Sequence, residues 1–215
     1  MTRALALAAV MLGAQFAGAQ ATWSADAPKA DTVKGQAIVT QVCAACHGAD
    51  GNSIVPANPK LAGQIPEYVQ KQMLNFKLGA GGKPAERASP VMAGFAATLS
   101  NDDIRNVAAY LASQKPSPGT AKNKDTIVIG QRLWRGGDVS KSLAACASCH
   151  GPAGAGVPVQ YPRLAGQHAD YTEAQLKAFR ARERNNDAAG IMSSIALKMT
   201  DAEIRAVADY IAGLR

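Results

Sequence analysis

A pattern of five residues, Cys-x-x-Cys-His, occurs twice in the chain and restricts its fold more than any other feature. The copies span residues 43–47 and 146–150, and together they contain all four cysteines of the 215 residues. Glycine follows each copy, and corresponding residues lie 103 positions apart. Each copy places two thiols and an imidazole within about one helical turn, so we expect the same local structure to be built twice.

The sequence around the pattern repeats as well, which indicates two related domains. The offset of 103 holds through a Leu-Ala-Gly-Gln segment and two aromatic residues, and further on it becomes 100. The matched pairs are Leu61 and Leu164, Tyr68 and Tyr171, Phe76 and Phe179, Met92 and Met192, Ile104 and Ile204, and Tyr110 and Tyr210. The second copy has eight extra residues before its cysteines and three fewer between Tyr171 and Met192. Two units are too few for a solenoid, so we interpret the pattern as a tandem duplication.

The two ends of the repeat give the expected domain boundaries. Residues 1–21 predict an export signal, because Arg3 precedes an apolar run that ends in small residues suited to cleavage. A membrane anchor is the alternative, but the run is shorter than the ~20 residues that a span needs. Residues 114–124 are rich in Pro, Gly, Ser and Lys and predict a linker. We therefore expect domains at 22–113 and 125–215.

Each copy is predicted to be all-α. Hydrophobic residues are spaced as on one helix face at Ile104, Val107, Ala108 and Leu111, and again at Ile204, Val207, Ala208 and Ile211. Ser100 with Asp103, and Thr200 with Glu203, predict capping boxes at the starts of these helices. We expect a middle helix at about 66–78 and at about 169–184, and a first helix before each cysteine pair. Neither copy shows the alternation typical of strands.

Composition and charge narrow the classes of function. Aromatic residues make up only 5% of the chain, and small domains with few of them have thin cores, which a large apolar cofactor would complete. The formal net charge of +7 falls to +6 when Arg3 leaves with the export signal. The charges are interspersed, which argues against a nucleic-acid partner and leaves peripheral membrane association open.

The Cys-x-x-Cys-His pattern is the attachment signal of haem c. The two thiols form thioethers with the haem vinyl groups, and the histidine binds the iron. We therefore expect Cys43, Cys46 and His47 to hold one haem, and Cys146, Cys149 and His150 to hold a second. A thioredoxin-like disulfide would need a βαβ pattern, and a zinc site would not need a histidine beside each pair, so both alternatives explain less.

The sixth ligand of each iron is predicted to be a methionine. Met92 and Met192 match one another, and both lie in loop-like stretches before the last helix. Met73 and Met199 are matched by leucines, as ordinary core positions allow. The alternative is that Met92 and Met192 are two coincident core residues. His168 has no histidine counterpart in the first copy, and we expect it at the surface.

A proline lies twelve residues after each motif histidine, at Pro59 and Pro162. A histidine that binds a metal normally donates its other ring N–H to a fixed acceptor, which sets the tautomer and the ring orientation. We expect the carbonyls of these two prolines to be those acceptors.

Together these features resemble a class I cytochrome c, and in tandem they resemble the dihaem cytochrome c4 family. The resemblance rests on the cysteine motif, the later Pro-(Lys/Arg)-Leu-Ala-Gly-Gln segment, the late methionine and the closing helix with its tyrosine. It implies two class I cytochrome c-like domains, each wrapped around one covalent haem c. It also implies that Gly35 meets Tyr110, and Gly130 meets Tyr210, where the first and last helices cross. The extra residues around 136–138 and the shorter segment before Met192 depart from the family pattern.

Histidine and methionine together fill both axial positions of an iron, which favours an electron carrier over an enzyme. The resemblance implies a periplasmic carrier that takes electrons from a quinol-oxidising cytochrome bc complex and delivers them to a terminal oxidase. Two alternatives remain. One is a cytochrome subunit of a periplasmic dehydrogenase. The other is a dihaem enzyme, a peroxidase or a thiosulfate dehydrogenase, in which one iron has a labile, missing or cysteine ligand.

Overall fold

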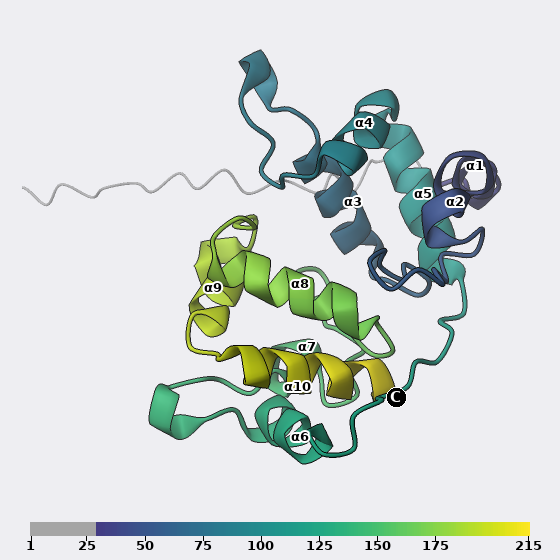
Figure 1. The fold of residues 1–215 in the computed structure, drawn as a ribbon. Helices are drawn as coiled ribbons and strands as arrows, with labels where there is room; N and C mark the ends of the chain where they lie inside the picture. Colours follow the sequence, from purple (N-terminus) through teal and green to yellow (C-terminus); the bar gives the residue numbers. More distant parts are fainter. Residues whose placement is uncertain (1–28) are drawn as a thin grey trace, which may run out of the picture.

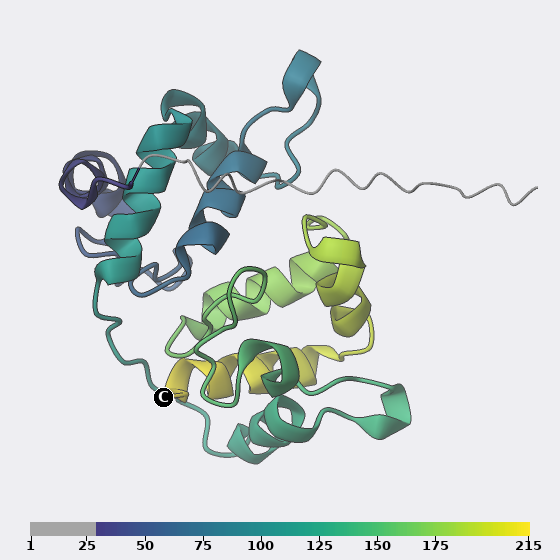
Figure 2. The same ribbon diagram turned by 180° about the vertical axis from the view of Figure 1, so that it is seen from behind.

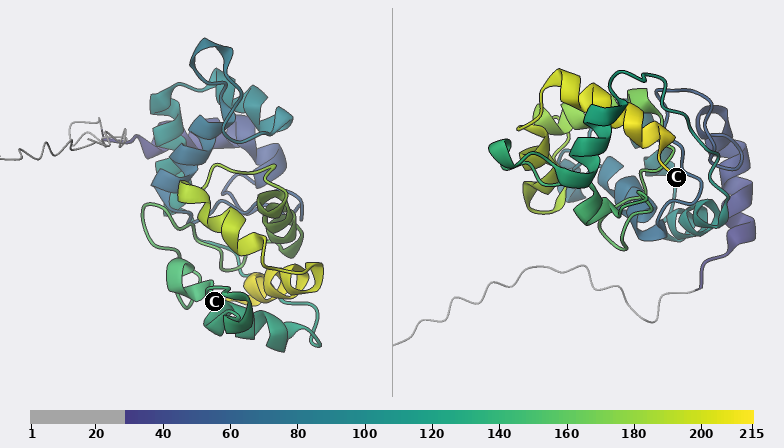
Figure 3. Two further views of the ribbon diagram at one scale, coloured as in Figure 1. Left: turned by 90° about the vertical axis from the view of Figure 1, so that its left-hand side faces the viewer. Right: turned by 90° about the horizontal axis from the view of Figure 1, so that it is seen from below.

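The computed structural model describes residues 29–215, and the predicted export signal at 1–21 lies outside them. The chain forms two helical domains, the first above the second in Figure 1, with the connecting segment running along one side (Figure 2). Figure 3 (left) shows the same order from another side. Within residues 29–215 the helices are accompanied by three isolated bridges and by no strand. The prediction of an all-α fold is confirmed. No helix of this described part is long and apolar enough to cross a membrane.

The two domains have the same order of helices. The first contains α1 (Thr32–Ile38), η1 (Val39–Cys43), α2 (Ala44–His47), α3 (Pro66–Phe76), η2 (Ala80–Gly82), α4 (Pro90–Thr98) and α5 (Asn101–Ser113). The second contains α6 (Ile127–Gly136), η3 (Val139–Lys141), α7 (Ala147–His150), α8 (Ala169–Arg180), η4 (Ala188–Gly190), α9 (Ile191–Ala196) and α10 (Asp201–Gly213).

The last helix of each domain forms as its sequence predicts. Both capping boxes are present, with Ser100 paired to Asp103 at α5 and Thr200 paired to Glu203 at α10. The predicted apolar faces are buried, from Ile104 to Leu111 in α5 and from Ile204 to Ile211 in α10. Each face packs against the first and middle helices of its own domain.

Glycine allows the first helix to cross the last one closely. A Cβ atom at Gly35 would lie 2.1 Å from the carbonyl oxygen of Asn106 and 3.0 Å from Cβ of Tyr110. In the second domain, a Cβ atom at Gly130 would lie 2.4 Å from the oxygen of Ala206 and 2.6 Å from Cβ of Tyr210. The expected meeting of Gly35 with Tyr110, and of Gly130 with Tyr210, is confirmed.

Two predicted helix boundaries were wrong. The middle helices end at Phe76 and Arg180, earlier than expected, because Lys77 is extended and Arg182 has a positive φ of 59°.

The stretches around Met92 and Met192 are helical rather than loop-like. The side chain of Ser89 accepts from the N–H of Met92, and Pro90 supplies a favourable first residue for α4.

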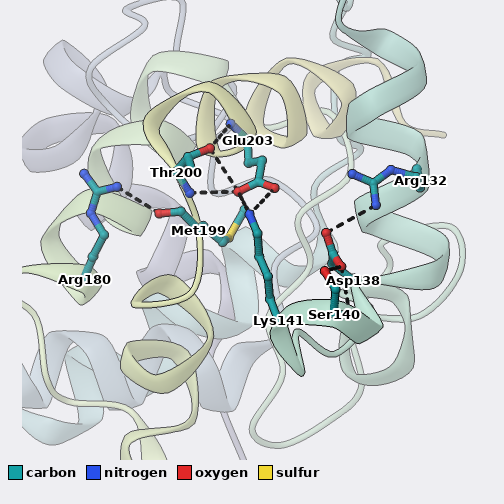
Figure 4. Close-up of polar contacts among 8 residues, drawn as sticks. All are labelled: Arg132, Asp138, Ser140, Lys141, Arg180, Met199, Thr200 and Glu203. Carbon is teal, nitrogen blue, oxygen red and sulfur yellow. Dashed lines mark hydrogen bonds and ion pairs between the residues drawn. The ribbon is translucent and has the colours of Figure 1, made fainter.

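The eight extra residues of the second domain form a loop that contains η3 and is pinned by ion pairs (Figure 4). Lys141 Nζ lies 2.7 Å from Glu203 Oε1 on α10, and Arg132 Nη1 lies 3.5 Å from Asp138 Oδ2. The same close-up shows Arg180 of α8, whose Nη1 donates to the carbonyl of Met199 at 3.1 Å. The insertion therefore packs against the last helix and keeps the fold of the domain.

Replacement of Gly130 by alanine should destabilise the protein, because the new Cβ atom meets backbone that cannot move freely. We expect Gly130→Ala to lower the free energy of unfolding by about 1–3 kcal/mol. Gly136 of the same helix has no atom within 4 Å of an added Cβ, so Gly136→Ala is the matched control and should be neutral or slightly stabilising. Thermal unfolding of the haem-loaded protein measures both, and equal losses in the two variants would contradict the close crossing.

Candidate functional site

The two cysteine motifs form matching short helices. Cys43 ends η1 and α2 follows it to His47, while Cys146 caps α7, which ends at His150. The glycine after each histidine has a φ of 79° or 80°, which ends the helix and turns the chain away. Each motif thus presents its thiols and imidazole from a single helical turn.

All four cysteines are free thiols in the structure. Burial raises the pKa of Cys43, and it raises the pKa of Cys146 to about 11. Neither sulfur is therefore a thiolate at neutral pH, and no disulfide joins either pair. Two free thiols one turn before a histidine match the attachment motif of haem c.

Both motif histidines are buried and held by the predicted prolines. His47 Nδ1 lies 3.0 Å from the carbonyl oxygen of Pro59, and His150 Nδ1 lies 3.0 Å from that of Pro162. A carbonyl only accepts, so Nδ1 carries the proton and Nε2 keeps its lone pair. Burial lowers the pKa of both rings, which keeps them neutral. The expectation for the two proline carbonyls is confirmed.

The loop between histidine and proline is fixed by further hydrogen bonds. In the first domain, Ser53 Oγ and Asn58 Nδ2 donate to the carbonyl of Cys46 at 2.9 and 3.1 Å. In the second domain, Trp134 Nε1 donates to the carbonyl of Pro152 at 3.0 Å, and the ring of Tyr161 packs edge-on against that of His150. The donor set and its fixed geometry fit a covalent haem c in each domain.

The four methionines of the described residues differ in burial. Met199 is buried in the core of the second domain, while Met73 packs against the core of the first and Met192 against that of the second. Met92 and Met192 are half-buried and lie in the first turns of α4 and α9. The role of Met92 and Met192 as iron ligands stays a prediction.

The expectation of a surface position for His168 was wrong. The residue is half-buried at the boundary between the domains, where its Nε2–H donates to the carbonyl of Ser53 at 2.8 Å. Its counterpart Ile65 is buried. The sequence offered no signal for this contact, because a match of histidine to isoleucine says nothing about the other domain.

Two buried arginines form a further set of contacts across this boundary. Arg87 Nη2 donates to the hydroxyl of Tyr171, and Arg184 Nη2 donates to that of Tyr68, both at 2.9 Å. Each guanidinium also lies over a phenylalanine ring of its own domain. Arg184 follows the end of α8 and is buried at this boundary.

The chain is similar to known proteins in both sequence and structure. The family model "Cytochrome c" matches residues 32–115 and 135–215. A cytochrome c4 from Thiocapsa roseopersicina is 43% identical over 86% of this chain and 93% of its own. A thiosulfate dehydrogenase electron acceptor from Thiomonas intermedia is 39% identical over 99% of this chain and 91% of its own. The crystal structure of reduced cytochrome c4 from Pseudomonas stutzeri has a TM-score of 0.80 and 40% identity, covering 87% and 100% of the two chains.

Removal of one cysteine pair should remove one haem. Intact-mass measurement should find two haem masses on the wild type and one on the double variant Cys146→Ala/Cys149→Ala, because thioethers need both thiols. Ser148→Ala is the control, since the first motif has alanine at the matching position. One haem on the wild type, or two on the double variant, would contradict the assignment of one haem to each motif.

Proposed function

The chain belongs to the cytochrome c4 family of dihaem electron-transfer cytochromes, and from this premise we propose that it is a periplasmic carrier between two respiratory complexes. Its electrons would come from a quinol-oxidising cytochrome bc complex and go to a terminal oxidase. The export signal predicted at residues 1–21 and the two histidine sites support this role.

Each site is proposed to bind its iron through one histidine and one methionine, His47 with Met92 and His150 with Met192. The observation that carries this proposal is the fixed Nδ1–H of each histidine, which leaves Nε2 for the metal. The sequence repeat supports it, because Met92 and Met192 match one another while Met73 and Met199 are each matched by a leucine. When bound, each haem supplies an iron that accepts one electron from a reduced donor and passes one to an oxidised acceptor.

The protein contributes a rigid and closed ligand set. With one histidine and one methionine on each iron, a small substrate would find no free position on the metal, which supports a carrier. All four cysteines belong to the attachment motifs, so none is spare as an axial ligand. The peroxidase and thiosulfate dehydrogenase alternatives would each require a change in this set.

A second candidate is an acceptor for one dedicated dehydrogenase. Two relatives with 39% identity, from Thiomonas intermedia and Stutzerimonas stutzeri, carry the name thiosulfate dehydrogenase electron acceptor. In this role the chain would take electrons from a thiosulfate-oxidising enzyme by outer-sphere transfer, in which the donor does not bind the iron. The ligand set is the same in both candidates, and only the donor differs.

Replacement of either methionine should open one axial position. Oxidised wild type should show the weak near-infrared charge-transfer band of iron bound to a methionine sulfur. Met92→Ala and Met192→Ala should each remove about half of it, because each affects one of two sites. Met73→Leu is the control and should leave the band intact. A band that keeps its full intensity in each of the two alanine variants would overturn the ligand assignment.

The choice of partner can be tested by transient kinetics. Reduced protein mixed with a purified terminal oxidase should be oxidised rapidly, at a rate that depends on ionic strength because the processed chain carries a formal charge of +6 before its haem propionates are counted. Steady-state assays with peroxide and with thiosulfate alone should show little turnover. Rapid reduction by a thiosulfate dehydrogenase, with slow transfer to every oxidase tried, would favour the dedicated acceptor, and efficient turnover of either small substrate would favour an enzyme.

A further inference from the structure

Two glutamines reach across the boundary between the domains and pair with the backbone of the other domain. Gln64 Oε1 accepts from Arg163 N at 2.9 Å, and its Nε2 donates to Arg163 O at 3.0 Å. Gln167 Oε1 accepts from Lys60 N at 2.9 Å, and its Nε2 donates to Lys60 O at 2.9 Å. Both glutamine side chains are buried, and every polar atom of their amides is used.

The backbone N–H that each glutamine accepts from belongs to the peptide group whose carbonyl holds a motif histidine. The peptide bond from Pro162 to Arg163 accepts from His150 Nδ1 at its carbonyl and donates to Gln64 at its N–H. The peptide bond from Pro59 to Lys60 does the same between His47 and Gln167. In each case, one planar, conjugated peptide group joins the glutamine of one domain to the histidine of the other.

We propose that Gln64 and Gln167 are positioning residues that tune the haem of the opposite domain through this peptide group. Gln64 acts on the site of His150, and Gln167 acts on the site of His47. The inference rests on the iron-ligand roles proposed for the two histidines. It goes beyond those roles by giving each domain an influence on the reduction potential of the other.

The physical reason is that hydrogen bonds in series polarise one another. When the peptide N–H is donated to a glutamine oxygen, its carbonyl oxygen becomes a stronger acceptor. A stronger acceptor draws the Nδ1 proton more firmly and makes the imidazole a more electron-rich ligand. Such a ligand stabilises iron(III) relative to iron(II). Loss of the glutamine should therefore raise the reduction potential of the opposite haem.

The test is the pair of reduction potentials in Gln64→Met, which keeps the length of the side chain and removes its amide. We expect the iron(III)/iron(II) equilibrium of the His150 site to shift about threefold toward iron(II), or about 28 mV at 59 mV per tenfold for one electron. The His47 site should shift much less. Gln167→Met should give the mirror image, with the shift at the His47 site.

Tyr68→Phe is the control, because it weakens the hydrogen bonding between the domains but touches neither histidine peptide. Potentials are measured by spectroelectrochemistry and assigned to domains by following the haem methyl signals in NMR spectra at each stage of oxidation. In the reduced protein, the Nδ1–H of His150 should also exchange faster in Gln64→Met, with that of His47 unchanged. Should this variant fail to retain two haems, Gln64→Asn replaces it, since its amide is one methylene too short to reach Arg163.

Four results would overturn the inference. The reduction potential could shift in the substituted domain instead, shift equally in both domains or not shift at all, or Tyr68→Phe could give the same shift. Failure of the underlying ligand assignment would look different. In that case, the wild type itself would lack histidine ring signals shifted by each haem. If those signals are present and the potentials do not respond, the histidine ligands stand and the role of the glutamines does not.

Discussion

The hydrogen bond from each motif histidine to the proline carbonyl twelve residues later is the interaction on which the rest of the structure depends. It fixes the tautomer of His47 and of His150 and leaves Nε2 of each ring free for the iron proposed there. The short helix with its two thiols lies on one side of this bond, and the loop that ends in proline lies on the other. The first and last helices then close around this unit where glycine meets tyrosine.

Duplication has made the contact between the two domains self-complementary. Gln64 hydrogen-bonds the backbone of Arg163, and Gln167 hydrogen-bonds that of Lys60. In the same reciprocal way, each of the two buried arginines donates to a tyrosine of the opposite domain. Such reciprocal contacts are typical of a twofold interface between identical subunits. Here they join two halves of one chain, so that each electron-carrying site is supported partly by residues of the other.

Local features were predictable from the sequence, and contacts between the domains were not. Ser100 and Thr200 gave the starts of the last helices, and the spacing of Pro59 and Pro162 gave the histidine acceptors, because these signals act over a few residues or recur in both copies. The burial of Arg184 and the contact of His168 depend on which surface of one domain packs against the other, and local sequence patterns do not give this. The repeated glutamine, seen in both copies from the start, had a physical meaning only once Gln64 was found against Arg163.

The most direct test is an NMR spectrum of the reduced protein with isotope-labelled methionine methyl groups. Four methionines remain after residue 21, and the ring current of a haem shifts the methyl group of an axial ligand strongly upfield. Two signals should be shifted in this way, assigned to Met92 and Met192 by substitution, while those of Met73 and Met199 stay within the range of core residues. A single shifted signal, or one that belongs to Met73 or Met199, would contradict a pair of closed histidine–methionine sites.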